Sequence, residues 1–154
     1  MAQINPPGFP IERGKIHEFA NSILDDHPLY HDEEAAKAAG LPSVVAPPTF
    51  SFASAFFPSS RPQGGPRSGG PSIGGLDMRF VLHGGQELIF ERPLFAGDVL
   101  KAEPGETKSY EKAGRRGGTM KFIESETIYR DAQGEIVLRS RNTLIQTAGV
   151  VKDS

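Results

Sequence analysis

The stretch from Asp25 to Phe50 reads DDHPLYHDEEAAKAAGLPSVVAPPTF and combines acids, imidazoles, a tyrosine and a Pro-Pro pair between two apolar segments. That is more titratable chemistry than a connecting segment needs. We therefore expect any active site of the chain to lie in this stretch, and the flanking segments to form the fold that presents it.

The segment before this stretch has the periodicity of an amphipathic helix that begins near Gly14. Its apolar residues fall at i, i+3, i+4, i+7 and i+8 and are predicted to face the core: Ile16, Phe19, Ala20, Ile23 and Leu24. His17 falls on the polar face, so we expect a surface residue there. Pro28 forbids continuation of the helix, which predicts a turn between Asp25 and His31.

Two further helices are predicted within and after the stretch. Asp32 is the expected N-cap of a short helix that ends at Gly40, with acidic residues in its first turn. The run from Thr49 to Phe57 is apolar nearly all round, which predicts a buried helix with Pro47 and Pro48 at its start. A buried strand is the alternative for so short a run.

The rest of the chain divides into a loop and a series of strands. Residues 58–76 are rich in Gly, Pro and Ser, which predicts a mobile loop within one domain. From Asp77 onward, β-branched and aromatic runs alternate with turns, and the turns are expected at Gly84-Gly85, Ala96-Gly97, Gly114 to Gly118 and Asp131 to Gly134. Helices followed by a strand meander favour an α+β fold, an antiparallel sheet with one buried helix on its concave side.

Length, charge and cysteine content exclude several classes of function. The 154 residues have the size of one domain. A net charge of -2 gives no basic field for a phosphate backbone, so nucleic acid is not an expected partner. The absence of cysteine excludes disulfides and thiolate chemistry. Neither a signal peptide nor a membrane-spanning run is recognisable, which predicts a cytoplasmic protein with no membrane partner.

The polar cluster has few chemical options. Solvated loop residues cluster in this way too, so the composition alone does not require a site. His27 and His31 are four residues apart, but Pro28 breaks the helix that would place both imidazoles on one face as metal ligands. A serine nucleophile on a sharp strand-to-helix turn is missing. General acid and base work by a carboxylate with an imidazole or phenol is the remaining option.

These residues carry a resemblance to a known family. DDHPLYHDEEAA followed by VVAPPTF resembles D-x-N-P-L-H-x-D-x-x-A followed by A-H-G-M in the MaoC-like (R)-specific enoyl-CoA hydratases of the hot-dog superfamily. The resemblance is closer to the N-terminal dehydratase-type half domains of that family, which typically read N-P-L-Y-x-D-E-x-A-A and A-P-P-T-F. HGGQELIFERPLFAGDVL is similar to their H-x-x-Q-x-x-x-x-x-R-P-L-x-A-G-D segment. The likeness spans residues 12–147 and implies a single hot-dog domain over 1–154, an antiparallel sheet wrapped around a central helix.

The resemblance also implies roles for individual residues. In catalytic members an Asp and a His activate the water that adds to a trans-2-enoyl-CoA, and backbone N–H groups at the start of the central helix hold the thioester oxygen. The better register places Asp25 at the family Asp and Tyr30 at its His. A rival register pairs Asp26 with His31. Asp25, Tyr30 and His31 are therefore the candidate catalytic residues.

Two features of the sequence argue against full activity. Tyrosine titrates near pH 10 when unperturbed, roughly three units above histidine, so Tyr30 is a poor proton acceptor. Pro48 stands where the catalytic members have the Gly of His-Gly, and proline has no N–H to direct at an oxyanion. The loss of one such donor typically costs about a hundredfold or more in rate.

The resemblance thus implies a non-catalytic half of an enoyl-CoA hydratase or 3-hydroxyacyl-thioester dehydratase, with no cofactor and no metal. Such a half would line the acyl tunnel and pair with itself or with a catalytic MaoC-like subunit around an acyl-CoA or acyl-carrier thioester. The residues expected to contact the substrate are Pro48, Thr49, Phe52, Phe56 and His83. His83 has the alternative role of hydrogen-bonding its turn. The alternatives for the whole chain are a self-sufficient homodimeric hydratase that uses Asp25 with His31 or Tyr30, and an acyl-CoA-binding or scaffold module without turnover.

Overall fold

The computed structural model describes residues 8–56, 76, 78–114 and 118–147. Five strands of this part form one antiparallel sheet in the order β1-β3-β4-β5-β2. The strands are β1 (Phe9–Pro10), β2 (Val81–Phe90), β3 (Val99–Ala113), β4 (Thr119–Arg130) and β5 (Ile136–Gln146). The helices are α1 (Arg13–Ser22), α2 (Pro28–His31), α3 (Glu33–Ala38) and two 3-10 helices, η1 (Pro48–Phe56) and η3 (Met78–Phe80).

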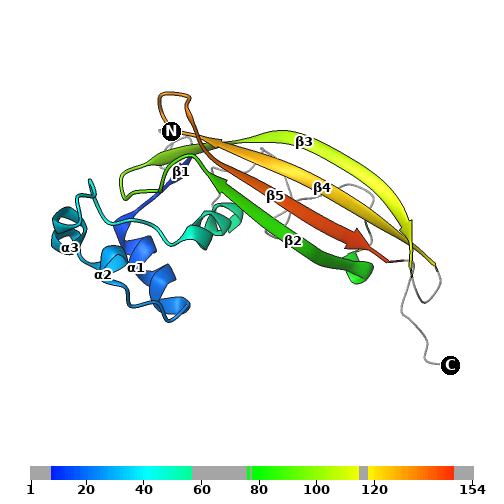
Figure 1. Cartoon of the computed structure of the whole chain (residues 1–154), viewed down its shortest axis with the longest axis horizontal. Helices are drawn as coiled ribbons and strands as arrows, with labels where there is room; N and C mark the ends of the chain where they lie inside the picture. The colour runs from blue at the N-terminus through cyan, green and yellow to red at the C-terminus, as the bar shows by residue number, and fades with distance from the viewer. Residues whose placement is uncertain (1–7, 57–75, 77, 115–117, 148–154) are drawn as a thin grey trace, which may run out of the picture.

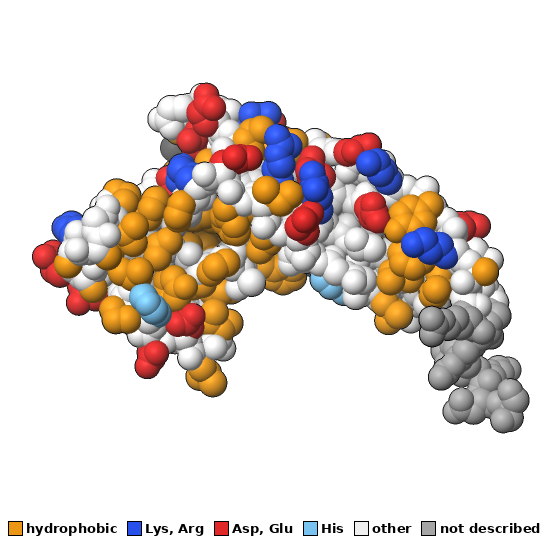
Figure 2. Space-filling view, viewed as in Figure 1, with side chains coloured by type: hydrophobic (Ala, Val, Ile, Leu, Met, Phe, Trp, Pro, Cys, Tyr) orange, Lys and Arg blue, Asp and Glu red, His pale blue; other side chains and the backbone are white. Residues whose placement is uncertain are grey.

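The sheet curves around η1, and α1, α2 and α3 lie together near one end of the strands (Figure 1). Hydrophobic side chains gather over this helical end, and the molecule is hollowed on one side like an arch (Figure 2). A hydrogen bond of 2.8 Å between the buried side chains of Ser54 in η1 and Tyr129 in β4 fixes the helix to the sheet. The predicted α+β class, with a sheet wrapped around one helix, is therefore confirmed.

Phe50 joins the helices to the sheet edge. Its ring stacks on Phe9 of β1 with centroids 5.7 Å apart and meets the edge of Phe19 of α1 at 5.4 Å. Ile16 and Ala20, on the same face of α1 as Phe19, are completely buried. Burial of a large apolar side chain stabilises a fold by roughly 1.5–3 kcal/mol, so these contacts set the position of η1 relative to α1.

The predicted caps of the short helix are confirmed. The Asp32 side chain accepts hydrogen bonds from the backbone N–H groups of Glu34 and Ala35, which are two of the donors that a helix start leaves unsatisfied. Gly40 follows the helix with a φ of 78°, a left-handed conformation that glycine adopts without a steric cost.

The predicted burial of Ile23 and Leu24 is wrong, because α1 ends at Ser22. Leu24 has a φ of 58° and is 92% exposed, and Ile23 is 47% exposed. The N–H of Asp25 bonds to the Ala20 carbonyl at 2.9 Å, and the N–H of Leu24 bonds to the Asn21 carbonyl at 3.1 Å. This pair of bonds around a left-handed residue is a Schellman ending, with leucine in the place usually taken by glycine.

The predicted turn at Gly84-Gly85 is also wrong, because β2 runs through these residues as one strand. Its pairing with β5 shifts register between His83 and Gly85, so the extra residue is a β-bulge. A Cβ at Gly84 would lie 2.8 Å from the Ile145 side chain, which explains glycine there. β3 likewise runs as one strand past Gly105, with a register shift between Pro104 and Thr107. The turns at Ala96-Gly97 and Asp131 to Gly134 are confirmed.

The helix predicted from Thr49 to Phe57 exists as η1, so the alternative of a strand is wrong. Among the side chains of η1 that the structure describes, Phe50, Ser51 and Ser54 are buried, whereas Phe52 is 52% exposed. The predicted loop over 58–76 lies outside the described residues except for Leu76. Within the described part of the chain, none of the helices has the length and apolar character needed to traverse a bilayer.

Candidate functional site

The Asp25 to His31 turn is built from hydrogen bonds between neighbours. An Asp25 carboxylate oxygen accepts the backbone N–H of His27 at 3.2 Å. The Nδ1 atom of His27 in turn accepts the N–H of Leu29 at 3.3 Å and caps α2, in which Pro28 occupies the first helical position. Proline is favoured there because the N–H that it lacks would have no partner within the helix. Tyr30 and His31 therefore both lie on the single helical turn of α2.

A backbone bond connects this turn to the start of η1. The N–H of Val45 donates to the carbonyl of Leu29 at 3.0 Å, and the N–H of Ala46 donates to the carbonyl of Leu94 at 2.8 Å. The segment that leads into Pro48 is therefore held between α2 and the residues that follow β2. In this way the fold brings the two halves of the predicted site, the Asp25 turn and the start of η1, to the same end of the molecule.

Tyr30 is half-buried and packs against the core. Burial raises the pKa of its hydroxyl above the ordinary value, and the neighbouring Asp25 carboxylate raises this pKa further. Both effects disfavour the phenolate. At neutral pH Tyr30 therefore keeps its proton and can donate a hydrogen bond, but it does not act as a base.

His31 is in contact through both ring nitrogens. Its Nε2 atom lies 2.9 Å from the carbonyl oxygen of Asp25, and its Nδ1 atom lies 2.7 Å from Nδ1 of His17. The two rings meet edge to face with centroids 4.7 Å apart. His17 lies on the exposed face of α1, as its phase in the helix predicts. Its contact with His31 was not predicted, because the helical period gives the face of a residue and not its partner on another helix.

The start of η1 is poor in backbone donors. Pro48 is its first residue and has no N–H, and the N–H of Phe50 donates to the carbonyl of Pro47 at 2.9 Å. Pro48 and Thr49 are both exposed, as is Phe52. The side chain of Phe56 lies outside the described residues. Pro48 therefore offers no backbone donor at this helix start.

The bulge at Gly84 aligns two polar residues of β2. His83 is opposite Leu144 in β5 and Gln86 is opposite Asn142. Opposed residues of antiparallel strands share a face, and Asn142 and Leu144 are two apart, so His83 and Gln86 point to the same side. Gln86 donates to the hydroxyl of Ser140 at 3.2 Å on the side of the sheet that faces η1. His83 is thus placed mid-strand and exposed, not in a turn.

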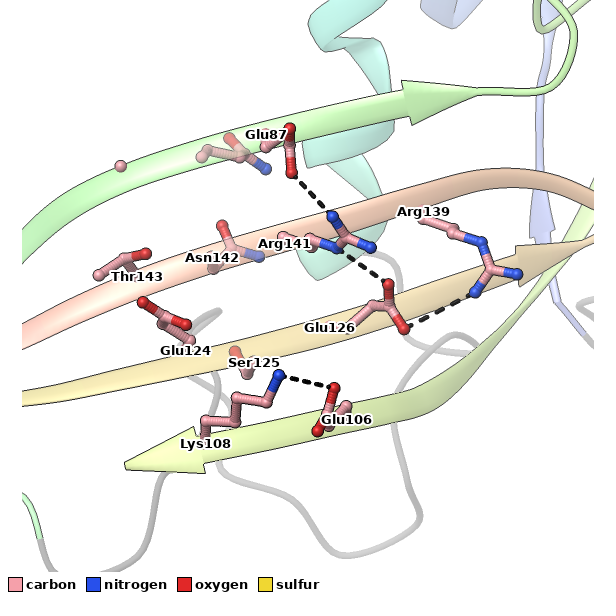
Figure 3. Close-up of a pocket in the computed structure, with 12 residues that line it drawn as sticks. Glu87, Glu106, Lys108, Glu124, Ser125, Glu126, Arg139, Arg141, Asn142 and Thr143 are labelled. Atoms are coloured by element: carbon pink, nitrogen blue, oxygen red, sulfur yellow. Dashed lines mark hydrogen bonds and ion pairs between the residues drawn. The ribbon is translucent and has the colours of Figure 1, made fainter. Parts of the chain in front are cut away.

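A groove of about 680 Å³ lies on the opposite, outer face of the sheet, away from η1 (Figure 3). Arg141 pairs with Glu87 and Glu126, each at 3.2 Å, and Arg139 pairs with Glu126 at 3.7 Å. Lys108 pairs with Glu106 at 3.1 Å, so each of the three basic side chains that line the groove is held in an ion pair. This groove suits neither an apolar acyl chain nor a phosphate, and the Asp25 turn does not contribute to it.

Metal ligands do not converge in the part of the chain that the structure describes: His, Asp and Glu side chains form no group of three suited to one ion there.

Comparison with known proteins places these observations in a family. Residues 2–140 match the family described as FAS1-like, dehydratase domain region. The chain is 35% identical over 139 residues to a UPF0336 protein of Saccharopolyspora erythraea, a match that covers 90% of this chain and 82% of that protein.

Solved structures show the same fold. The HadBC (3R-hydroxyacyl-ACP dehydratase) complex of Mycobacterium tuberculosis contains a chain that matches with a TM-score of 0.65 and 25% identity, over 92% of this chain and 91% of that one. A MaoC-like dehydratase matches with a TM-score of 0.72 and 26% identity, over 92% of this chain and 40% of that one. The hot-dog fold implied by the sequence motifs is confirmed.

Proposed function

Because the chain belongs to the FAS1-like dehydratase domain family, with the hot-dog fold of the MaoC-like dehydratases, we propose that it is the accessory half of a two-part hydro-lyase. The reaction would be the hydration of a trans-2-enoyl thioester or the reverse dehydration of a 3-hydroxyacyl thioester. The thioester would be carried by coenzyme A or by an acyl-carrier protein. A catalytic MaoC-like partner would supply the acid and the base.

The state of Tyr30 is the observation that carries this proposal. The family resemblance puts a histidine base at this position. Here a phenol, whose ordinary pKa of about 10 already keeps it protonated at neutral pH, has that pKa raised further by burial and by the Asp25 carboxylate. Two further features support the same conclusion. His31 has both ring nitrogens in hydrogen-bond contact, and Pro48 brings no N–H to the start of η1.

The match to a chain of the HadBC complex supports a role for this chain as one component of a dehydratase of two different subunits. An accessory half would contribute the shape of the acyl site and not its proton transfers. Phe52, which is half-exposed on η1, is the candidate wall for the acyl chain, and His83 and Gln86 are polar residues on the side of the sheet that faces η1.

The test is hydration of crotonyl-CoA, followed by loss of the enoyl-thioester absorbance. The purified chain is assayed alone and after mixing with a MaoC-like protein of the same genome that has an intact D-x-N-P-L-H motif. We expect no turnover by this chain alone and a rate for the mixture well above that of the partner alone. Turnover by this chain alone that disappears in Asp25→Asn would instead establish the self-sufficient hydratase.

A substitution at Phe52 tests its role in the acyl site. Replacement by Ala removes a large half-exposed ring from η1 and should shift the preference of the complex toward longer acyl chains. The matched control is Phe95→Ala, because Phe95 is partly buried next to the Arg92–Asp98 corner and is outside the proposed acyl wall. A Phe52→Ala complex with the wild-type ratio of rates on short and long enoyl-CoA substrates would contradict the proposed wall.

A further inference from the structure

We infer that His17 is a positioning residue: it fixes the ring of His31 in one tautomer and, through that ring, holds the Asp25 turn. A continuous series of three contacts links α1, α2 and the Asp25 turn. It runs from Nδ2 of Asn21 to Nε2 of His17 at 3.1 Å, from Nδ1 of His17 to Nδ1 of His31 at 2.7 Å, and from Nε2 of His31 to the carbonyl oxygen of Asp25 at 2.9 Å.

For two neutral rings, the Asp25 carbonyl at the end of this series of contacts fixes the direction of every hydrogen bond. The carbonyl of Asp25 can only accept, so Nε2 of His31 carries the hydrogen. In a neutral ring the other nitrogen is then an acceptor, so Nδ1 of His31 must receive a hydrogen from Nδ1 of His17. Neutral His17 is left with Nε2 as an acceptor, and the amide of Asn21 has an N–H to meet it. One assignment thus satisfies all three contacts.

This assignment has a consequence for the chemistry of the site. The only lone pair on the His31 ring that could accept a proton is directed at His17, and its N–H is used by the Asp25 backbone. His31 is therefore held as a structural link between α1 and the turn and is withheld from general base catalysis. The link joins the carbonyl of Asp25 to a helix whose other face is buried through Ile16 and Ala20.

Nuclear magnetic resonance of the neutral rings tests the assignment directly, because a long-range ¹H–¹⁵N correlation distinguishes the two tautomers. The chain has four histidines, so the spectrum is tractable. We expect His31 as the Nε2–H tautomer and His17 as the Nδ1–H tautomer. Finding His31 with its hydrogen on Nδ1 would overturn the inference.

Two matched variants separate the hydrogen bond from the packing. His17→Phe keeps a ring for the edge-to-face contact but has no donor, whereas His17→Asn loses the ring but keeps an N–H on the atom bonded to Cγ, as in Nδ1–H. We expect His17→Phe to shift the ¹⁵N signals of His31 toward those of a ring that exchanges between tautomers, and His17→Asn to restore the single tautomer. A His31 spectrum unchanged in His17→Phe would refute the positioning role.

Asn21→Ala gives an independent test, since it changes an exposed side chain and leaves the rings of His17 and His31 in place. It should increase exchange between tautomers more in His17 than in His31. A larger increase in His31 would contradict the proposed direction of the hydrogen bonds. Circular dichroism and the Ile16 methyl signals report whether each variant is folded. The inference goes beyond the accessory role, and these spectra require neither substrate nor partner, so the outcome is separate from that of the hydration assay.

Discussion

Replacement of Leu24 by glycine is expected to stabilise the folded chain, although glycine usually destabilises. Leu24 has a φ of 58° at the Schellman ending of α1, where its Cβ crowds the backbone. Its side chain is 92% exposed, so almost no apolar burial is lost when it is removed. The substitution therefore relieves the backbone without emptying the core.

The size of the effect follows from two opposing terms. A left-handed conformation costs a residue with a Cβ roughly 1–2 kcal/mol, which glycine does not experience. Glycine adds roughly 0.5–1 kcal/mol of conformational entropy to the unfolded chain, which opposes folding. The expected net gain is about 0.5–1 kcal/mol in the free energy of unfolding. For a domain of this size, that corresponds to an increase in Tm of about 1–4 °C.

Urea unfolding monitored by circular dichroism gives the free energy, with Leu24→Ala as the matched control. Alanine has the same exposed environment but retains a Cβ, so its stability should lie within about 0.5 kcal/mol of the wild type. Asparagine, which tolerates left-handed angles better than leucine, should fall between alanine and glycine. A glycine variant that is less stable than the alanine variant would refute the assignment of strain at Leu24.

Three other substitutions test the fold. Burial raises the pKa of Tyr129 above the ordinary value of 10.0, so the folded state keeps the hydroxyl proton to higher pH than the unfolded state does. The free energy of unfolding should therefore fall above about pH 10, by at most about 1.4 kcal/mol per pH unit. Tyr129→Phe should reduce this dependence on pH, measured by urea unfolding at a series of pH values. Gly8→Ala should cost roughly 2 kcal/mol or more, because φ is 126° and the new Cβ would lie 2.9 Å from the Leu100 carbonyl oxygen. Asp98→Asn should cost about 1–2 kcal/mol in chemical denaturation, because the carboxylate receives two Arg92 N–H groups at 2.7 and 3.0 Å. An unchanged alkaline slope, or wild-type stability in either of the other variants, would contradict the corresponding contact.

Sequence signals were sufficient wherever a few neighbouring residues decide the structure. Asp32 caps α3 because its own side chain reaches N–H groups two and three residues on, and Gly40 ends the helical segment through its own backbone freedom. The period of two acts as locally in β5, where Leu138 is buried and Arg141, three positions on and so on the other face, is exposed. These features need no knowledge of the rest of the fold.

The two wrong predictions have different causes, one distant in the chain and one local. A glycine pair indicates a turn in isolation, yet Gly84 lies inside β2 because the side chain of Ile145, on a neighbouring strand, occupies the space of its Cβ. Ile23 and Leu24 continue the apolar period of α1, but Pro28 forces the chain out of the helix and the Schellman bonds end it first. Period and composition alone do not contain these constraints.

The candidate site shows the same division. The motif placed Asp25 and Tyr30 at one turn, and the structure brings them close enough for the carboxylate to raise the pKa of the phenol. His17 could not be found in this way, because its partner His31 is fourteen residues further on and belongs to another helix. An i, i+4 pair of polar residues, His17 and Asn21, is the one local signal, and it is common on exposed helix faces.

The contacts of the Asp25 turn show which groups hold the proposed site in shape. Tyr30 packs against the core as a protonated phenol, and Leu29 receives the N–H of Val45, so both residues still place the entry to η1. Both ring nitrogens of His31 are in hydrogen-bond contact, one with His17 and the other with the carbonyl of Asp25. A turn held by these contacts suits the proposed accessory half of a hydro-lyase, because fixed side chains keep the acyl site beside a catalytic partner in one shape.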